Sequence, residues 1–421
     1  MDNIWFFHHY ATVPYRNGYV RPFRFAEHIK DNYKTSIFCS SYHHWSGEQV
    51  ITDNKLFKIE TVDDVNFVYV KTPSSAAGAF ARIVNMLSFM INLRKVGKKY
   101  LKSNGLPEVI VASSPHPFTM LAGIWFAKRY KIPCICEIRD LWPEAIFYGS
   151  KLKEKSIIGK LLISGEYWIY KKADALIFTK EGDTDYLKEH KWTTEQGGKI
   201  SLDKCFYINN GIEFEKYQND INENKINDTD LDDDTFKVVY AGAIRPVNNV
   251  GNIIEAANLL KKYKDIKFLI YGDGNQKEQL KKKIIDYGLE NVVFKGFVEN
   301  KFIPYILSKS SVNLLNYSSS NYNWTRGNSS NKLFEYLASG KPVISTVKTG
   351  YSIIQKYDCG FEMNNQTAEG LAANILRVKA LDKNEYDRMC LNALRGAKDF
   401  DYNILSEKLL KVIDYAVKNC K

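Results

Sequence analysis

The sequence lacks long apolar runs, a dense set of cysteines and the features of a signal peptide. No uninterrupted stretch of about eighteen apolar residues occurs, so we expect no membrane span. Acidic Asp2 and the polar residues His8 and His9 interrupt the apolar start of the chain, unlike a secretory leader. The seven cysteines are scattered and form no zinc-type pairing, which predicts a reduced, cytoplasmic setting.

Two common nucleotide-binding fingerprints are also absent. The glycine-containing turns of the second half include no G-x-G-x-x-G, and the chain has no G-x-x-x-x-G-K-[ST]. These absences argue against a dinucleotide-binding site and a P-loop. No cluster of metal-ligating residues is evident either, so we expect no metal and no resident cofactor.

What the chain does have is size and positive charge. Its 421 residues favour two domains, and 45% hydrophobic with 25% charged residues is typical of globular proteins. The formal charge of +11 suggests an anionic partner, which could be nucleic acid, a phosphorylated substrate or a membrane surface. No nucleic-acid motif appears, so we expect no nucleic-acid partner.

Apolar strands alternate with helical patterns in both halves, which predicts parallel, doubly wound α/β sheets. We expect one domain over residues 1–205 and a second over 206–400. Residues 401–421 would form a helix that could cross back to the first domain. Residues 219–235 are rich in Asn and Asp, and we expect them to be a flexible surface segment.

Two stretches in the first half combine lysines or arginines with apolar residues. Residues 76–107 contain six basic residues and no acidic one, and apolar side chains recur there at helical spacing. Residues 151–172 show a similar mixture. Such a pattern suits an anionic bilayer surface, although a core-packed helix with a solvated basic end gives the same pattern.

The stretch 329–344 predicts a helix, a tight turn and a buried strand. Ser329, Ser330 and Asn331 offer N-cap oxygens, and Gly340 can take the left-handed position after the helix. A phosphate would be attracted to the helix start. Upstream, several strands end in turns with glycines that let a ligand approach the backbone, and cations accompany them, which describes a cradle for a nucleoside diphosphate.

These motifs resemble glycosyltransferase family 4 in their order and approximate spacing. The second half carries YAGAI at 240–244, YGDG at 271–274, VFKGF at 293–297 and KLFEY at 332–336, the last followed by SGKPVI. RDLWPE at 139–144 and SSP at 113–115 resemble the branch that builds bacterial surface polysaccharides. The resemblance covers nearly the whole chain.

The resemblance implies a GT-B fold, two Rossmann-like domains with the active site in the cleft between them. It implies transfer of a sugar from a nucleoside-diphosphate sugar, by family habit a UDP-sugar, with retention and without a metal. Glu335 would bind the ribose, Arg245 and Lys332 the diphosphate, and Phe297 and Val298 the base. The full donor-binding set that we expect is Gly18, Gly242, Arg245, Gly272, Gly274, Phe297, Val298, Asn328, Asn331, Lys332 and Glu335.

Two positions depart from the family pattern. The first Glu of the family's E-x7-E motif is Gly327 here, and Asn328 or Arg326 could substitute for it. The family's amino-terminal catalytic His is replaced, with Arg139 and Asp140 at the corresponding strand end. We therefore take Asp140, Arg139 and His116 as the candidate catalytic residues.

The leading hypothesis is a retaining hexosyl- or N-acetylhexosaminyltransferase of surface-polysaccharide (capsule or O-antigen) biosynthesis. It would use a lipid-linked or saccharide acceptor and lie peripherally on the inner face of the cell membrane. The alternatives are a sugar-nucleotide epimerase of the same fold and a non-catalytic protein that binds nucleotide sugars.

Overall fold

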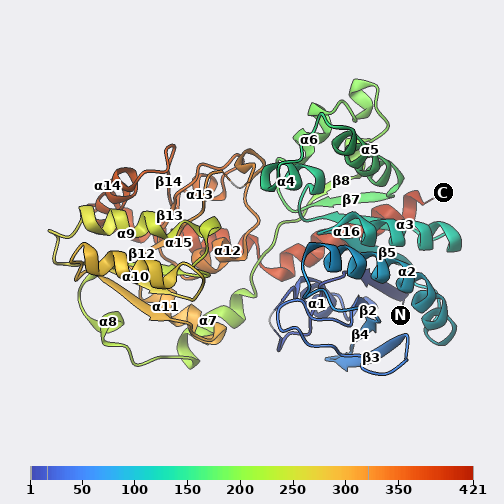
Figure 1. Cartoon of the computed structure of the whole chain (residues 1–421), viewed down its shortest axis with the longest axis horizontal. Helices are drawn as coiled ribbons and strands as arrows, with labels where there is room; N and C mark the ends of the chain where they lie inside the picture. Colours follow the sequence, from blue (N-terminus) through green and yellow to red (C-terminus); the bar gives the residue numbers. More distant parts are fainter. Residues whose placement is uncertain (1, 17, 321, 421) are drawn as a thin grey trace. The chain divides into compact units, whose positions relative to one another are not determined.

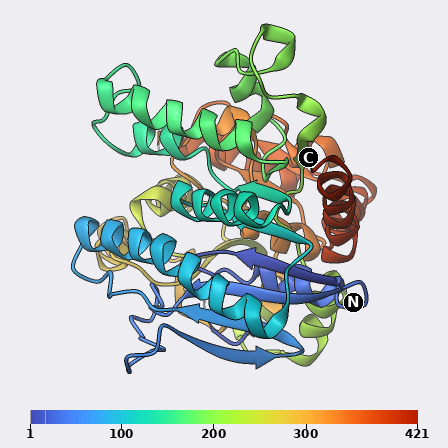
Figure 2. The same ribbon diagram turned by 90° about the vertical axis from the view of Figure 1, so that its right-hand side faces the viewer.

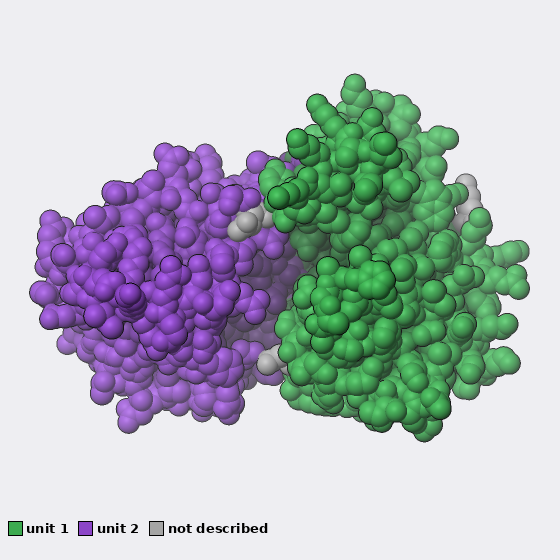
Figure 3. Space-filling model, viewed as in Figure 1, with its two compact units in different colours: residues 1–209, 402–421 green, residues 210–401 purple. Residues whose placement is uncertain are grey.

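The computed structural model describes residues 2–16, 18–320 and 322–420, and it divides into two compact units. Unit 1 comprises residues 1–209 and 402–421, and unit 2 comprises residues 210–401 (Figures 1 and 3). The first boundary falls after residue 209 rather than 205, because the last strand of the first sheet continues the fold of unit 1. The carboxyl-terminal helix is part of unit 1.

Unit 1 is an eight-stranded sheet with helices on both faces. Its elements are β1 (Asp2–Phe7), α1 (Arg21–His28), β2 (Tyr33–Ser40), β3 (Phe57–Val62), β4 (Val65–Val70), α2 (Ala79–Asn104), β5 (Val109–Ser113), α3 (Pro117–Tyr130), β6 (Cys134–Ile138), α4 (Trp142–Gly149), α5 (Ile157–Lys172), β7 (Ala175–Phe178), α6 (Asp183–Glu189), β8 (Cys205–Tyr207) and α16 (Tyr402–Asn419). The strand order is β3-β4-β2-β1-β5-β6-β7-β8, and only β3 pairs antiparallel to its neighbour.

Helices α2, α3 and α5 lie side by side in unit 1, as Figure 2 shows in light blue to green. Beneath them an aromatic core includes Trp5, Phe38, Tyr100 and Phe126, and the ring centroids of Trp5 and Phe126 are 5.4 Å apart. Helices α1 and α16 contact each other, and α16 also packs on β5, β6 and β7. Both faces of this largely parallel sheet are therefore covered.

Unit 2 repeats the plan with a six-stranded, fully parallel sheet of order β11-β10-β9-β12-β13-β14. Its elements are α7 (Phe214–Glu223), α8 (Thr229–Asp232), β9 (Phe236–Ala241), α9 (Val250–Leu259), β10 (Ile266–Tyr271), α10 (Lys277–Asp286), β11 (Val292–Gly296), α11 (Ile303–Ser308), β12 (Val312–Leu315), α12 (Asn331–Ala338), β13 (Val343–Ser345), α13 (Ile353–Tyr357), β14 (Gly360–Glu362), α14 (Ala368–Lys379) and α15 (Lys383–Asp399). The predicted parallel α/β class is confirmed for both halves.

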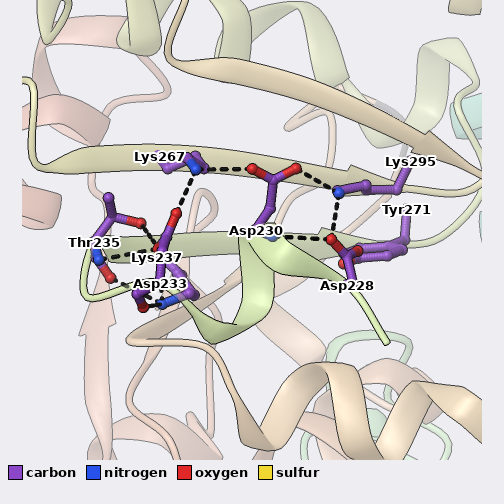
Figure 4. Close-up of polar contacts among 8 residues, drawn as sticks. All are labelled: Asp228, Asp230, Asp233, Thr235, Lys237, Lys267, Tyr271 and Lys295. Carbon is purple, nitrogen blue, oxygen red and sulfur yellow. Dashed lines mark hydrogen bonds and ion pairs between the residues drawn. The ribbon is translucent and has the colours of Figure 1, made fainter. Parts of the chain in front are cut away.

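The prediction that residues 219–235 form a flexible surface segment is wrong. This stretch contains the end of α7 and all of α8, and Leu231 is 2% exposed. Figure 4 shows its aspartates facing lysines that come from neighbouring strands. Asp230 lies 2.8 Å from Lys267 Nζ of β10 and 2.5 Å from Lys295 Nζ of β11. Composition alone suggested disorder, but the partners of these charges lie elsewhere in the chain.

Helix α2 also differs from the expected amphipathic pattern. The apolar positions of this stretch are not all buried, since Ile83 is 49% exposed. The buried face instead runs through Asn85, Phe89, Leu93 and Val96. Burial of Asn85 is explained by hydrogen bonds, because its amide lies in a polar network of unit 1 that is described below.

Candidate functional site

In unit 2, the turns after β9, β10 and β11 are joined by backbone hydrogen bonds. The Gly242 N–H donates to the Tyr271 carbonyl at 3.0 Å, and the Gly272 N–H donates to the Gly296 carbonyl at 2.7 Å. The Ile244 N–H donates to the Asp273 carbonyl at 2.8 Å. These carboxyl-terminal turns therefore form one connected edge, the place where parallel α/β sheets bind ligands.

Two of the predicted glycines are needed because the turns pack on each other. A Cβ on Gly272, where φ is 132°, would lie 1.9 Å from the Gly242 carbonyl oxygen. A Cβ on Gly274 would lie 2.2 Å from the Ile244 carbonyl oxygen. The space that we expected a ligand to use beside these two glycines is occupied by neighbouring backbone.

Lys332, in the first turn of α12, lies against the turn after β9. Its Nζ would be 2.9 Å from a Cβ on Gly242, so glycine leaves room for the ammonium group. Nζ lies 3.4 Å from the Tyr240 hydroxyl and 5.0 Å from the ring centroids of both Tyr240 and Tyr317. Burial lowers the pKa of Lys332 to about 8, and the charge of Glu335 opposes that shift.

Glu335 follows Lys332 on the same helix and is half-buried. Burial raises the pKa of its carboxyl, and the Lys332 charge opposes the increase. Among the residues that the structure describes, no side chain hydrogen-bonds to this carboxylate or lies within ion-pair distance of it. A cation and a carboxylate are thus held together at the sheet edge with few polar partners, an arrangement typical of ligand sites.

The other predicted donor residues near this edge differ in how exposed they are. Arg245 follows β9 and is exposed, and Phe297 follows β11 with its ring 70% exposed. Val298 is half-buried beside it. Asn328 is buried, and its Oδ1 accepts a hydrogen bond from the Ser330 N–H at 2.9 Å in the turn before α12.

The start of α12 differs from the expected cap. Ser330 occupies the N-cap position, but its hydroxyl makes no capping hydrogen bond. Asn331 is the first helical residue and its side chain is exposed. The prediction for the other end is confirmed, since Gly340 has φ 66° directly after the C-cap residue Ser339.

Gly327 has a backbone that an L-residue rarely adopts, with φ 111°. A glutamate at this first position of the E-x7-E motif would be strained in this conformation. A glutamate introduced at this position would therefore require a change in the local backbone as well.

In unit 1, the candidate residues Arg139 and Asp140 form the turn after β6. The Arg139 N–H donates to Ser114 Oγ at 2.9 Å, and its carbonyl accepts from Thr179 Oγ1 at 2.9 Å. The ends of the two flanking strands, β5 and β7, thus hold this turn. Asp140 Oδ1 is 3.4 Å from Lys180 Nζ, and the Asp140 side chain is 45% exposed.

His116, the third catalytic candidate, is 1% exposed and belongs to a buried chain of side chains. Asn85 Nδ2 donates to the Pro73 carbonyl at 2.5 Å, so Asn85 Oδ1 accepts from His9 Nε2 at 2.6 Å. A neutral His9 then accepts at Nδ1 from His116 Nε2, also at 2.6 Å. His116 Nδ1 is buried and has no hydrogen-bond partner within the described chain.

Burial keeps these imidazoles neutral. It lowers the pKa of His9 to about 3 and, together with the Arg139 charge, lowers that of His8 to about 3. For His116, burial and repulsion from His9 and His8 lower the pKa. At 1% exposure His116 is closed to solvent, whereas the side chain of Asp140 is accessible.

A buried ion pair lies beside the histidines. Glu137 is a residue of strand β6 and is 3% exposed. Its Oε1 accepts from Arg21 Nε at 2.8 Å, and Ser113 Oγ donates to Oε2 at 2.5 Å. Burial would raise the Glu137 pKa, but Arg21, Arg139 and Ser113 outweigh it and lower the pKa to about 2.

Gly18 lies in unit 1, and its donor-binding role stays a prediction. A Cβ at this position, where φ is 152°, would lie 2.5 Å from Thr12 Cγ2. The adjacent Tyr19 ring is 4.5 Å from the Arg139 guanidinium carbon. Gly18 thus permits the loop that places an aromatic ring on Arg139.

Sequence reasoning missed the residues that surround the candidates. Tyr240 belongs to the YAGAI motif at 240–244, but nothing in the sequence indicates that Tyr317 and Asn248 also border Lys332. His9 follows the first strand, and a polar pair at the carboxyl end of a strand is a signal that could have been used. Its partner His116 is 107 residues away.

Neither a metal cluster nor a membrane-spanning helix is found in the part of the chain that the structure describes. No group of three His, Cys, Asp or Glu residues is arranged to hold an ion there. None of the described helices combines the length and apolar composition that crossing a membrane requires.

Comparison with known proteins gives a consistent picture. Residues 221–395 match the family model described as Glycosyl transferases group 1. TuaH of Bacillus subtilis (strain 168), whose name describes a candidate teichuronic acid biosynthesis glycosyltransferase, is 28% identical over 224 residues, 53% of this chain and 52% of TuaH. The chain thus aligns with about half the length of this relative.

Solved structures match nearly the whole chain. Sucrose-phosphate synthase from Thermosynechococcus elongatus has a TM-score of 0.70 at 14% identity, with 98% of each chain covered. Anabaena Alr3699/HepE in complex with UDP has a TM-score of 0.65 at 13% identity, covering 98% of this chain and 100% of HepE. The fold is GT-B. The predicted fold class is confirmed, and the GT-B domain that holds Lys332 and Glu335 is the one that matches the group 1 model.

Proposed function

We propose that this GT-B protein is a glycosyltransferase that moves a sugar from a UDP-sugar to a lipid-linked or saccharide acceptor. The observation that carries the proposal is the placement of Lys332 and Glu335 at the carboxyl edge of the unit 2 sheet. Both residues lie within the 221–395 match to the group 1 glycosyl transferases.

The nucleotide would bind in unit 2. Glu335 would accept hydrogen bonds from the ribose hydroxyls, and Lys332 and exposed Arg245 would neutralise the diphosphate. The exposed Phe297 ring offers a surface for the base. A UDP donor is supported by the complex of HepE with UDP and by the resemblance of the motifs to glycosyltransferase family 4.

The acceptor would bind in unit 1 at the turn after β6. Asp140 combines an exposed carboxylate with a neighbouring Lys180 ammonium, and it could bind sugar hydroxyls or stabilise positive charge that develops on the transferred sugar. Arg139 would act beside it. His116, through His9 and Asn85, would keep this edge of the sheet in place.

The reaction joins the acceptor hydroxyl oxygen to the anomeric carbon while the bond from that carbon to the diphosphate oxygen breaks. The acceptor proton leaves with the diphosphate, and the cations on unit 2 stabilise the charge of the leaving group. The resemblance to family 4 supports retention of the anomeric configuration.

We further propose a role in bacterial surface-polysaccharide biosynthesis on the inner face of the cell membrane. The name of the TuaH relative supports the polysaccharide role. Exposed lysines and apolar side chains on α2 and α5 support attraction to an anionic bilayer, where each basic residue adds roughly 1 kcal/mol.

The test combines purified protein with UDP-glucose or UDP-N-acetylglucosamine, with and without a lipid-diphosphate saccharide. Release of UDP that requires the acceptor supports transfer. The Asp140→Asn variant should reduce turnover of this reaction and leave UDP affinity unchanged, because Asp140 belongs to unit 1. Exposed Glu369→Gln, at the start of α14, is the matched control.

Two results would contradict the proposal. An isomerised donor formed without acceptor would indicate the epimerase alternative. Binding of UDP-sugar with no product from any acceptor of the lipid-diphosphate class would indicate a protein that only binds the nucleotide.

A further inference from the structure

An apolar cavity of about 350 Å³ lies within unit 1, between α3, α4 and α5. Its walls include the indole side chains of Trp125, Trp142 and Trp168, together with Leu161 and Leu162. Its volume falls in the range of small-molecule sites, roughly 300–1,000 Å³. Figure 2 shows α3 and α5 running side by side.

The cavity includes one residue of the proposed acceptor site. Asp140 contributes to its lining, and the side chain of Asp140 is 45% exposed. Glu166 is the other carboxylate of the lining, and its oxygens accept hydrogen bonds from Tyr170 at 2.6 Å and Tyr186 at 2.7 Å. Asp140 therefore supplies the carboxylate of this cavity that remains accessible to a substrate.

The cavity also continues to an exposed apolar surface at the start of α5. Leu161 lines the cavity and is 70% exposed, and one turn earlier Ile157 and Ile158 are 89% and 59% exposed. Large aliphatic side chains rarely lie so open without a function when they adjoin one another.

The charge around this surface is positive. The flanking lysines are all exposed, and a single glutamate accompanies them: Lys151, Lys153, Lys155, Lys160 and Glu154. Lysines next to exposed aliphatic residues suit an anionic lipid surface, where the apolar side chains enter the bilayer boundary.

From this combination we propose that the cavity binds the hydrocarbon chain of a lipid-linked acceptor. The chain would enter past Leu161 from the membrane side, and the headgroup would present its hydroxyl at Asp140. The assignment of Asp140 to the acceptor rests on the proposed transferase function. The apolar walls and the basic, aliphatic entrance favour a lipid chain over a soluble sugar.

Gly165 offers a direct test because it lines the cavity on α5. A Cβ added there meets no atom within 4 Å, so the larger Gly165→Leu side chain would fill open space. Replacing a helical glycine also removes its unfavourable backbone entropy, so the variant should fold. Gly165→Ala adds only a methyl group, and Gly149→Leu places the same leucine at an exposed glycine outside the cavity.

The probe is a series of n-alkyl β-glucosides from hexyl to decyl, titrated below their micelle concentrations and followed by tryptophan fluorescence. In the wild type, affinity should rise about 4-fold per methylene, the factor that corresponds to about 0.8 kcal/mol for a buried methylene. Gly165→Leu should bind the decyl glucoside at least tenfold more weakly, while Gly165→Ala and Gly149→Leu retain the wild-type affinity. Equal affinity for all chain lengths, or an unchanged affinity in Gly165→Leu, would overturn the proposal.

The same preparations are titrated with UDP and assayed for transfer, so that the two proposals fail separately. Binding that depends on chain length, without transfer, would support the hydrocarbon site and contradict the transferase function. If the Gly165→Leu variant transfers sugar to a lipid-linked acceptor as well as the wild type does, the hydrocarbon site alone is contradicted.

Discussion

All seven histidines of the chain lie in unit 1, and unit 2 has none. The two candidate sites also differ in how closely their polar side chains are hydrogen-bonded. In unit 1, His9 has a partner on each ring nitrogen at 2.6 Å, and burial keeps it neutral. In unit 2, the Lys332 ammonium has its polar partners at 3.4 and 3.5 Å, and Glu335 has no side-chain partner in the described chain.

The two sites therefore differ in how many of their polar interactions are formed before a ligand binds. In the unit 1 network, His9 is hydrogen-bonded at both ring nitrogens, so it fixes the geometry of the strand ends without a ligand. The unit 2 pair holds opposite charges that are partly desolvated and poorly paired, so a ligand with hydroxyls and phosphates would supply the missing interactions. We therefore expect ligand-binding energy to depend mainly on unit 2 and acid sensitivity to involve the unit 1 histidines.

The largest expected effect is loss of nucleotide binding in Glu335→Ala. Two hydrogen bonds from ribose hydroxyls to a carboxylate contribute roughly 1.5–3 kcal/mol each, so UDP affinity should fall about 100-fold or more. Isothermal titration calorimetry with UDP measures this loss, and Glu369→Gln serves as the control. Unchanged UDP affinity would remove Glu335 from the donor site and with it the contrast between the units.

The second prediction concerns His9 and pH. Its pKa is about 3 in the folded protein and 6.5 when unfolded, so the unfolded state binds the extra proton as pH falls below 6.5. This contribution to stability is complete above pH 6.5 and is lost toward pH 3. At pH 5 the loss is about 2 kcal/mol, at 1.36 kcal/mol per pH unit.

Other groups in unit 1 act in the opposite direction, so the measurement uses a difference. Burial raises the pKa of Glu166 and of Asp183 to about 7, which favours folding as pH falls. Subtracting the unfolding free energy of wild type from that of His9→Gln cancels both terms. The difference, from urea unfolding followed by tryptophan fluorescence, should favour the variant by about 2 kcal/mol more at pH 5 than at pH 6.5. A constant difference would show that His9 is not buried in its neutral form.

Lys332 gives the third prediction. With a pKa of about 8, its charge is present at pH 7 and mostly lost at pH 9, so UDP affinity should fall up to about tenfold over this interval. Burial raises the pKa of Tyr240 strongly and that of Tyr317 to about 12, so neither ring titrates in this range. Calorimetry should find weak, pH-independent binding in Lys332→Met. A wild-type affinity that is flat between pH 7 and 9 would contradict the shifted lysine.

Lys332 also affects the stability of the free protein. Its folded pKa is below the ordinary lysine value of 10.5, so the unfolded state binds more protons between pH 8 and 10.5. The free energy of unfolding should therefore rise with pH across this window, and below pH 8 the buried charge costs stability in full. Lys332→Met should raise the urea midpoint at pH 7 while weakening UDP binding, a combination expected when a charge is retained for ligand binding.

The sequence predicted the strands that are buried on both faces, because their apolar runs are continuous. It missed β3, which is an edge strand in which Lys58 and Thr61 are exposed. The polar alternation of such a strand resembles that of a loop. Local patterns thus recover the strands with continuous apolar runs and miss this more polar edge strand.

For the candidate site, the motifs predicted which residues occupy the sheet edge but not what surrounds them. Lys332 and Glu335 lie one turn apart on one helix, so their proximity follows from spacing. The contact of Lys332 with Tyr240 spans 92 residues, and that of His9 with His116 spans 107. Such pairs depend on the strand order, which the sequence did not specify.

The smallest expected effect tests the segment that composition misassigned. Asp230 bonds to both Lys267 and Lys295, and these hydrogen bonds lower its pKa. The pairs are partly exposed, with side-chain exposures of 17–25%, so Asp230→Asn should lower the free energy of unfolding by only about 1 kcal/mol, and by less in high salt. Asp234→Asn, at an exposed position of the same segment, should have no effect.

Hydrogen exchange of residues 226–235 would report the change locally. Exchange that is already fast in the wild type would mean that the aspartates of α8 do not hold this helix on the sheet. The unit 1 network would then be the polar network that is fixed without a ligand.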